Sequence, residues 1–191
     1  MTSYRSFAGG LGNNLFQFAY IYAQARKKEI PDIYLQDPKH FEGFEEELRA
    51  LYSQGVEPIE MVGVHVRRGL NPTVPHEPAY AENPFYVNLC ETNYYERAMA
   101  EFPKDTQFLI VTDDKEFCKT TFPEHQIFEG ETDVDDWNAL AGCTQGVITA
   151  NSSFSWWAAF ANPSQPKVIA PKEWYADGEQ RTVLPPNWIQ L

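Results

Sequence analysis

Apolar residues gather along this chain in short runs that end in polar or charged side chains. The most pronounced run, residues 61–69, reads MVGVHVRRG. A short, β-branched apolar run closed by Gly is typical of a strand covered on both faces, as in a parallel sheet. Alternation along such a strand places His65 and Arg67 on one side and Val64 and Val66 on the other. The simpler alternative is a strand whose terminal arginines merely lie at the surface.

Further apolar runs alternate with segments of helical periodicity. Strands are predicted at residues 4–7, 32–36, 107–112, 146–150 and 167–171, and helices at residues 14–28, 41–52, 92–102, 115–121, 137–143 and 154–161. Strands that alternate with helices predict an α/β fold with a parallel sheet. The aromatic, Pro-rich residues 174–191 are expected to pack back over that sheet.

A glycine-rich loop, AGGLGN at residues 8–13, joins the first predicted strand to the first predicted helix. Gly10 and Gly12 would let the backbone approach a ligand closely, and the helix N-terminus favours a negative group. A third correctly spaced glycine is missing, so the loop does not match a dinucleotide-binding fingerprint. A glycine turn that only reverses the chain is the alternative.

Two carboxylates, Asp113 and Asp114, follow the strand at residues 107–112. The carboxyl ends of parallel strands meet at one edge of a sheet, where ligands bind, so these side chains are expected near Arg67. The alternative is helix capping of residues 115–121, and we expect one of the two to serve as that cap.

An acidic segment contains the sequence Asp133-Val134-Asp135. This DxD pattern holds a divalent metal on a sugar nucleotide in one class of glycosyltransferases. The pattern is short, however, and the same residues lead into a predicted helix, so capping of that helix accounts for them and is favoured.

The strand at residues 146–150 leads through Asn151, Ser152 and Ser153 into a helix with two tryptophans. Hydroxyl groups and free N–H groups at a helix N-terminus suit a diphosphate. The alternative is an ordinary Ser cap with aromatic core packing behind it.

Composition narrows the class of protein. The 191 residues are 43% hydrophobic and 15% aromatic, which excludes a disordered chain, and a formal net charge of −12 argues against a nucleic-acid partner. The chain has neither an apolar stretch of membrane-spanning length nor a signal-like N-terminus, so a soluble, cytoplasmic protein without a transmembrane segment is expected. The three cysteines lack metal-ligand spacing and are expected to be reduced.

Five motifs together resemble the α-1,2-fucosyltransferases of glycosyltransferase family 11. They are GGLGN at 9–13, HVRRG at 65–69, TDD at 112–114, NSSFSWW at 151–157 and LPPNWI at 184–189. The resemblance implies a GT-B-like α/β architecture of two Rossmann-like halves with parallel sheets. It also implies transfer of L-fucose from GDP-L-fucose to a galactoside hydroxyl with inversion, and no metal or other cofactor.

The resemblance divides the chain into three parts. Residues 1–58 would be a strongly reduced acceptor-side half with the glycine loop, residues 59–172 the donor-binding Rossmann-like domain, and residues 173–191 the tail. Partners would be a nucleotide-sugar donor and a glycan acceptor, while the oligomeric state is left open.

Site residues are carried over in the same way. Arg67 would hold the β-phosphate of the leaving GDP, supported by His65 and Arg68. The remaining expected donor-site residues are Gly10, Gly12 and Asn13 from the glycine loop, Asp113 and Asp114 in a positional role, Asp136 at the guanosine, and Ser152, Ser153 and Phe154 opposite.

Two departures from the family pattern keep alternatives open. The family has Asp where this chain has Leu70, and only about thirty residues separate the first helix from the central strand. A transferase with another nucleotide-sugar donor and an inactive nucleotide-sugar or glycan-binding remnant are therefore retained beside the fucosyltransferase. No general base is identified among the acidic residues.

Overall fold

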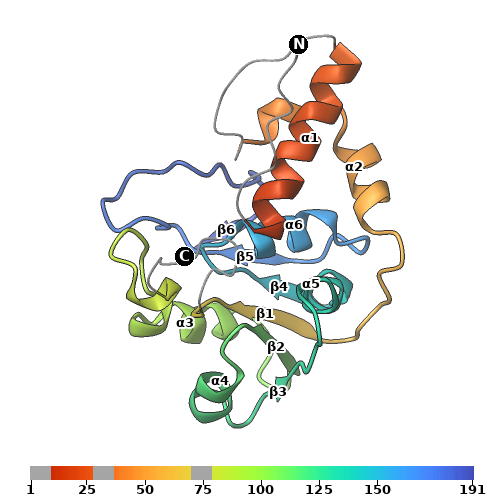
Figure 1. Ribbon diagram of the computed structural model, residues 1–191. Helices are drawn as coiled ribbons and strands as arrows, with labels where there is room; N and C mark the ends of the chain where they lie inside the picture. The colour runs from red at the N-terminus through yellow and green to blue at the C-terminus, as the bar shows by residue number, and fades with distance from the viewer. Residues whose placement is uncertain (1–9, 28–36, 70–78) are drawn as a thin grey trace.

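A computed structural model of the chain describes residues 10–27, 37–69 and 79–191. Six strands form one sheet in the order β3-β2-β1-β4-β5-β6, and every neighbouring pair is parallel (Figure 1). The strands are β1 (Val62–Val66), β2 (Phe108–Thr112), β3 (Gln126–Ile127), β4 (Gly146–Ile148), β5 (Val168–Ala170) and β6 (Ile189–Gln190). The predicted α/β fold is confirmed, and the strand order is that of a Rossmann-like domain, with its switch point between β1 and β4.

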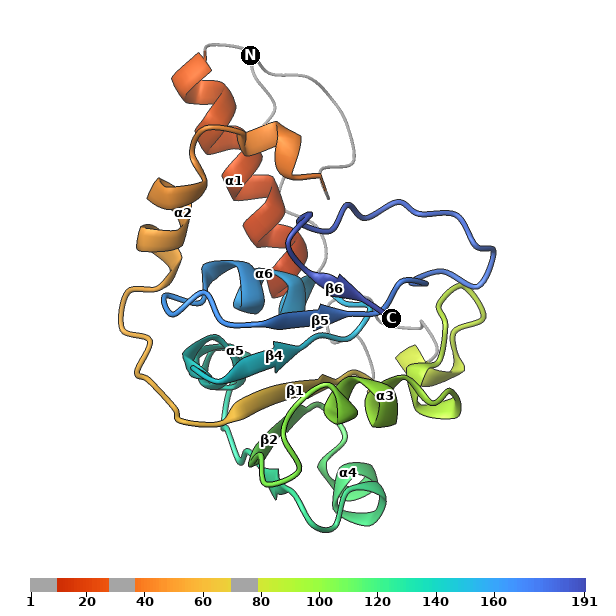
Figure 2. The same ribbon diagram turned by 180° about the vertical axis from the view of Figure 1, so that it is seen from behind.

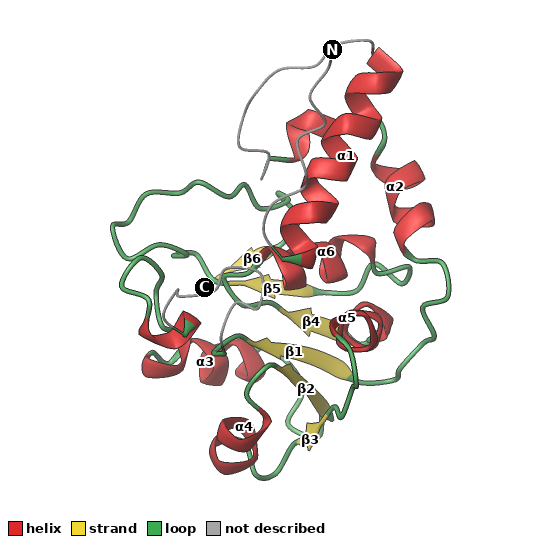
Figure 3. Ribbon diagram, viewed as in Figure 1, coloured by secondary structure: helices red, strands yellow, loops and turns green. Residues whose placement is uncertain are grey.

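Helices cover both faces of the sheet (Figures 2 and 3). The helices are α1 (Leu11–Lys27), α2 (Glu45–Tyr52), α3 (Tyr94–Ala100), α4 (Lys115–Thr121), α5 (Asp133–Gly142) and α6 (Ser153–Ala161). Short 3-10 helices occupy Pro38–Phe41, Tyr80–Glu82 and Leu89–Glu91. Helices α5 and α6 lie on one face, with α1 and α2 packed outside α6, and α3 and α4 lie on the other face.

Alternation along β1 separates its two faces as expected. Val62, Val64 and Val66 are buried in the cluster beneath α3 and α4. Gly63 faces α5, and a Cβ there would lie 2.8 Å from the Leu140 side chain. The glycine therefore lets α5 pack directly against the central strand.

An aromatic cluster fixes α1 on α6. The centre of the Phe16 ring lies 4.6 Å from the ring centre of Trp156 and 4.9 Å from that of Trp157. The rings of Trp156 and Phe160 are stacked, with their centres 5.1 Å apart. Trp156 also contacts Trp188 from the tail at 5.5 Å. Tight aromatic pairing of this kind adds to area burial, so the N-terminal helix and the tail belong to one core.

Several boundaries differ from the predictions for physical reasons. The expected helix at residues 41–52 is divided, because Gly43 adopts φ +83° and separates the 3-10 helix ending at Phe41 from α2. Helix α5 begins four residues earlier than predicted, since Thr132 and Asp135 form a capping box. The tail does more than cover the sheet, because Ile189–Gln190 extends it as β6.

The structure describes only part of residues 1–58, the predicted acceptor-side half. Its described residues form α1, a 3-10 helix and α2, while the predicted strands at residues 4–7 and 32–36 lie outside the described residues. The division at residues 58 and 172, and a second Rossmann-like half, therefore stay predictions.

Candidate functional site

The candidate site lies where β1, β2 and β4 end. Arg67 follows β1, Asp113 follows β2, and residues 151–153 connect β4 to α6. The N-terminus of α1 reaches the same place, since Asn13 contacts Ser153. Strand order explains why the three strand ends meet, because the switch point of a doubly wound sheet opens a crevice at its carboxyl edge.

Arg67 is largely buried and firmly held. Its Nη1 pairs with Asp113 Oδ2, and its guanidinium carbon lies 5.3 Å from the centre of the Tyr80 ring. The side chain is 18% exposed, and burial lowers the pKa of Arg67 below its ordinary value. An arginine keeps its charge despite such a shift, so the site holds a preoriented, weakly hydrated cation.

Arg68 turns away from Arg67 toward α4. Its guanidinium carbon lies 3.5 Å from the centre of the Phe117 ring, and its Nε lies 3.4 Å from Asp114 Oδ2. The backbone N–H of Arg68 donates to Asp113 Oδ1 at 2.8 Å. Asp113 therefore holds the backbone of one arginine and the side chain of the other.

Asp114 caps α4, as predicted for one of the two carboxylates. Its Oδ1 accepts the N–H of Phe117 at 3.1 Å. Its other oxygen faces Arg68, so the carboxylate links the end of β1 to the start of α4. These contacts give Asp114 a positional place in the structure.

Two helix N-termini meet beside the crevice. Ser153 Oγ donates to Asn13 Oδ1 at 3.0 Å, and the Ser152 hydroxyl caps α6 by accepting the N–H of Phe154. A Cβ on Gly12 would lie 2.2 Å from the carbonyl carbon of Ser153, whereas one on Gly10 would meet no atom within 4 Å. Gly12 thus permits helix-to-helix contact, and the two N-termini together favour an anion.

His65 is a buried neutral group next to this anion-favouring region. Its ring lies 5.0 Å from the Phe154 ring, and the residue is 4% exposed. Burial, with a smaller contribution from Arg67, lowers the pKa of His65 to about 3. Within the described ranges its Nδ1 has no hydrogen-bond partner, so the imidazole offers an uncharged polar atom at neutral pH.

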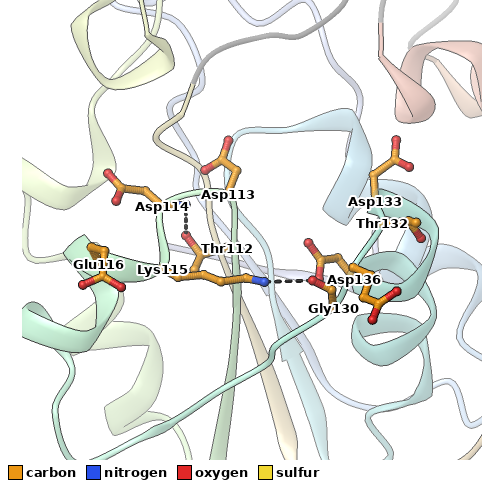
Figure 4. Close-up of a pocket in the computed structure, with 10 residues that line it drawn as sticks. Thr112, Asp113, Asp114, Lys115, Glu116, Gly130, Thr132, Asp133 and Asp136 are labelled. Atoms are coloured by element: carbon orange, nitrogen blue, oxygen red, sulfur yellow. Dashed lines mark hydrogen bonds between the residues drawn. The ribbon is translucent and has the colours of Figure 1, made fainter.

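An acidic cleft of about 520 Å³ lies between the first turns of α4 and α5 (Figure 4). It is lined by Thr112, Asp113, Asp114, Lys115, Glu116, Gly130, Glu131, Thr132, Asp133 and Asp136. The Lys115 side chain crosses the cleft, and its Nζ donates to the carbonyl oxygen of Gly130 at 2.9 Å. Asp113 lines this cleft and also pairs with Arg67, so one carboxylate lies between the cleft and the arginine.

Asp136 is the half-buried carboxylate of this cleft. Burial raises the pKa of Asp136 above its ordinary value, against an opposing effect of Lys115. Its Oδ1 lacks a hydrogen-bond partner among the described residues. A Cβ on Gly130 would lie 2.2 Å from that oxygen, so the glycine makes room for the Asp136 carboxylate.

The DxD segment serves as a helix start. Asp135 Oδ2 accepts from the N–H and the hydroxyl of Thr132 at 2.9 and 2.8 Å, so the capping alternative is confirmed. Across residues 10–27, 37–69 and 79–191, no group of three or more His, Cys, Asp or Glu side chains is arranged to hold a metal ion. The same ranges contain no helix with the length and apolarity needed to cross a membrane.

Tyr80 escaped the sequence-based prediction of the site, and Asn151, which the sequence placed in a diphosphate-binding segment, has its amide engaged elsewhere. Tyr80 lies against Arg67, and its hydroxyl donates to the carbonyl oxygen of Asn151. The buried Asn151 amide donates to the carbonyl oxygens of Val87 and Trp174, each at 2.9 Å, so it is a structural connector. No local pattern could reveal the contacts of the Asn151 amide, because Val87 and Trp174 lie 64 and 23 residues away along the chain.

Comparison with known proteins identifies the family. The sequence profile of glycosyl transferase family 11 matches residues 8–191. The O-antigen biosynthesis glycosyltransferase WbnK of Escherichia coli is 28% identical over 139 residues, which cover 67% of this chain and 43% of that protein. An alpha-1,2-colitosyltransferase of Escherichia coli is 31% identical over 147 residues, which cover 68% of this chain and 47% of that protein.

The chain thus spans about half the length of the curated relatives it matches. No solved structure matches it. The profile match covers all five motifs, from the glycine loop to the C-terminal LPPNWI, and the parallel sheet brings residues from four of them to one edge. By the extent of that match, the chain belongs to glycosyl transferase family 11.

Proposed function

We propose that this chain transfers L-fucose from GDP-L-fucose to a galactoside hydroxyl, forming an α-1,2 linkage with inversion and without a metal. The observation that supports this most directly is the position of Arg67. It is a buried, preoriented guanidinium at the switch point of the sheet, beside the meeting N-termini of α1 and α6. A cation and two helix N-termini suit a diphosphate.

The donor would lie along the carboxyl edge of the sheet. Its diphosphate would contact Arg67, Asn13 and the start of α6, and its guanosine would occupy the acidic cleft. Guanine presents N–H donors, and the Asp136 carboxylate that lines the cleft is an acceptor of matching kind. Asp113 lines the cleft and pairs with Arg67, which supports one extended ligand that bridges both regions.

Arg67 would promote departure of GDP. As the bond to the sugar breaks, negative charge develops on the β-phosphate, and a fixed guanidinium stabilises that charge without reorganisation. Asp113 uses one nitrogen of the guanidinium, which leaves further N–H groups for the phosphate oxygens. Asp113 and Asp114 hold the two arginines. Both arginines therefore have a carboxylate partner even though this chain has Leu70 where the family has Asp, which supports an active transferase.

A second candidate is the same reaction with a different sugar nucleotide. One relative is named for colitosyl transfer, with 31% identity over 147 residues. The contacts proposed for the nucleotide and the diphosphate would remain, and the sugar pocket would differ. Incubation with a panel of nucleotide sugars distinguishes the two candidates.

The first prediction concerns Arg67. Loss of a donor that stabilises developing charge costs about 2.7–4 kcal/mol in other enzymes, so Arg67→Ala should lower turnover by about a hundredfold or more. Calorimetric titration with GDP and GDP-L-fucose in chelator, together with a donor-hydrolysis assay, measures binding and turnover. Arg97→Ala, an exposed arginine on α3, is the matched control and should leave both unchanged.

Each other outcome has a distinct meaning. Near-normal transfer by Arg67→Ala would contradict the assignment. Loss of wild-type activity in chelator would indicate a metal at Asp133-Val134-Asp135 instead. Binding without turnover would favour the remnant, and Leu70→Asp would then be the variant to test for rescue.

A further inference from the structure

We infer that Tyr80 is a positioning residue that fixes the plane of the Arg67 guanidinium at the switch point of the sheet. This inference rests on the proposed function of Arg67 at the donor diphosphate. Tyr80 touches Arg67 through its ring, and the effect we assign to it passes through that arginine.

Tyr80 connects the ends of the two strands that flank the crevice. Its backbone N–H donates to the carbonyl oxygen of Gly69 at 3.0 Å, just beyond β1. Its hydroxyl donates to the carbonyl oxygen of Asn151, just beyond β4 and one residue before the cap of α6. The ring is thereby stretched across the crevice, with Arg67 against its face.

A second aromatic layer prevents the Tyr80 ring from moving away. Tyr86 stacks on Tyr80 with ring centres 4.3 Å apart and 21° between the planes. Tyr86 in turn pairs with Tyr175, and backbone hydrogen bonds from Val87 to Trp174 and from Ala176 to Phe85 join the two segments. The tail therefore holds the segment of Tyr86, Tyr86 stacks on Tyr80, and Tyr80 contacts Arg67.

Asp113 alone does not define the orientation of Arg67. It binds Nη1, and a guanidinium held at one nitrogen can still rotate about that contact. A ring 5.3 Å from the guanidinium carbon restricts this rotation. Phosphate recognition by arginine depends on its planar fork, and a displacement of about 1 Å in a catalytic group can cost about a hundredfold in rate.

The test is a double-mutant cycle between Tyr80 and Arg67. We expect Tyr80→Leu to lower kcat about 10- to 100-fold, with a smaller change in the KM for GDP-L-fucose. In the Arg67→Ala background the same change should cost less than about threefold, because nothing remains to be positioned. Tyr80→Phe, which keeps the ring, should recover most of the loss.

Binding measurements separate positioning from a general effect on folding. Tyr80→Leu should weaken the binding of GDP, which has a diphosphate, and leave the binding of guanosine unchanged. Glu82→Ala, which removes an exposed side chain of the same segment, is the control and should change neither. Thermal unfolding of every variant shows whether each one is folded.

Three outcomes would overturn the inference. Normal kcat in Tyr80→Leu, equal losses in the presence and absence of Arg67, or a parallel loss of guanosine binding would each leave Tyr80 without a positioning role. These results, in an active wild type, would not affect the proposed function. A wild type that fails to bind GDP would overturn both proposals at once.

Discussion

The imidazole of His65 is the buried group whose protonation should be visible in the stability of the fold. Its pKa is about 3 in the folded chain, against an ordinary value of 6.5. Below pH 6.5 the unfolded chain therefore binds a proton that the native chain does not, so stability falls as pH decreases. Above pH 6.5 both states are neutral and His65 has no effect.

This difference gives a prediction for His65→Gln. Between pH 7 and pH 5 the wild type should lose about 2 kcal/mol of unfolding free energy through His65 alone, at about 1.4 kcal/mol per pH unit below pH 6.5. The variant should lack that part of the slope. Urea unfolding at several pH values measures it, and NMR titration of the imidazole provides a direct check. Titration of the His65 imidazole between pH 6 and 7 in the folded protein would contradict the prediction.

Site residues differed in how far the sequence could locate them. Arg67 and Asp113 follow apolar runs, and parallel strands deliver their carboxyl ends to one edge, so their proximity was predictable. The turn of Arg68 onto Phe117 was not predictable, because two adjacent arginines after a strand look alike in sequence. Tyr80 was missed because its contacts depend on the path of a loop through space.

At the scale of elements, the contact between the N-termini of α1 and α6 depends on one missing methyl group. A Cβ at residue 12 would lie 2.2 Å from Ser153 and 2.3 Å from the backbone nitrogen of Phe154. Neither neighbour can yield easily, because both atoms belong to the backbone that begins α6. The helices must therefore separate if residue 12 has a side chain.

We expect Gly12→Ala to destabilise the protein by about 1–3 kcal/mol and to weaken GDP binding, because the start of α6 would shift. Gly10→Ala is a matched control two residues away, since a Cβ there meets no atom within 4 Å. It should cost less than about 1 kcal/mol. Thermal unfolding measures the stability of both variants and calorimetry measures GDP binding by Gly12→Ala. An equal loss of stability in the two variants would disprove the close contact.

Long, periodic elements were predictable, and short or edge elements were not. The predicted helix at residues 115–121 matches α4, and the buried runs became β1, β2, β4 and β5. Strands β3 and β6 have two residues each, too few for any periodicity to appear. The start of α5 was missed because an acidic first turn resembles a loop, although Thr132 and Asp135 have capping-box spacing.

For the molecule as a whole, the C-terminal tail is part of the core. Trp188 is 7% exposed, and its ring lies 5.5 Å from Trp156. The Nε1 of Trp156 also donates to the carbonyl oxygen of Val183 at 3.1 Å. The tail therefore closes the same aromatic cluster that receives α1.

Trp188→Ala should lower the unfolding free energy by about 3–5 kcal/mol, as expected for a buried aromatic residue. Val183→Ala, at a position 46% exposed in the same tail, should stay within about 0.5 kcal/mol of the wild type, because its carbonyl group is retained. Denaturant unfolding followed by tryptophan fluorescence compares them. A cost for Trp188→Ala as small as that for Val183→Ala would show that the tail is peripheral.

The place of β6 and Trp188 far behind β1 along the chain has a consequence for biosynthesis. A ribosome adds about 5–20 residues each second, so β1 emerges several seconds before its sheet can be completed. Before the tail is synthesised, Trp156 lacks its contacts with Trp188 and Val183, and the edge of β5 that pairs with β6 has no neighbouring strand. The nascent chain therefore exposes apolar surface and an unpaired strand edge until β6 has been synthesised, and the sheet is completed only after that point.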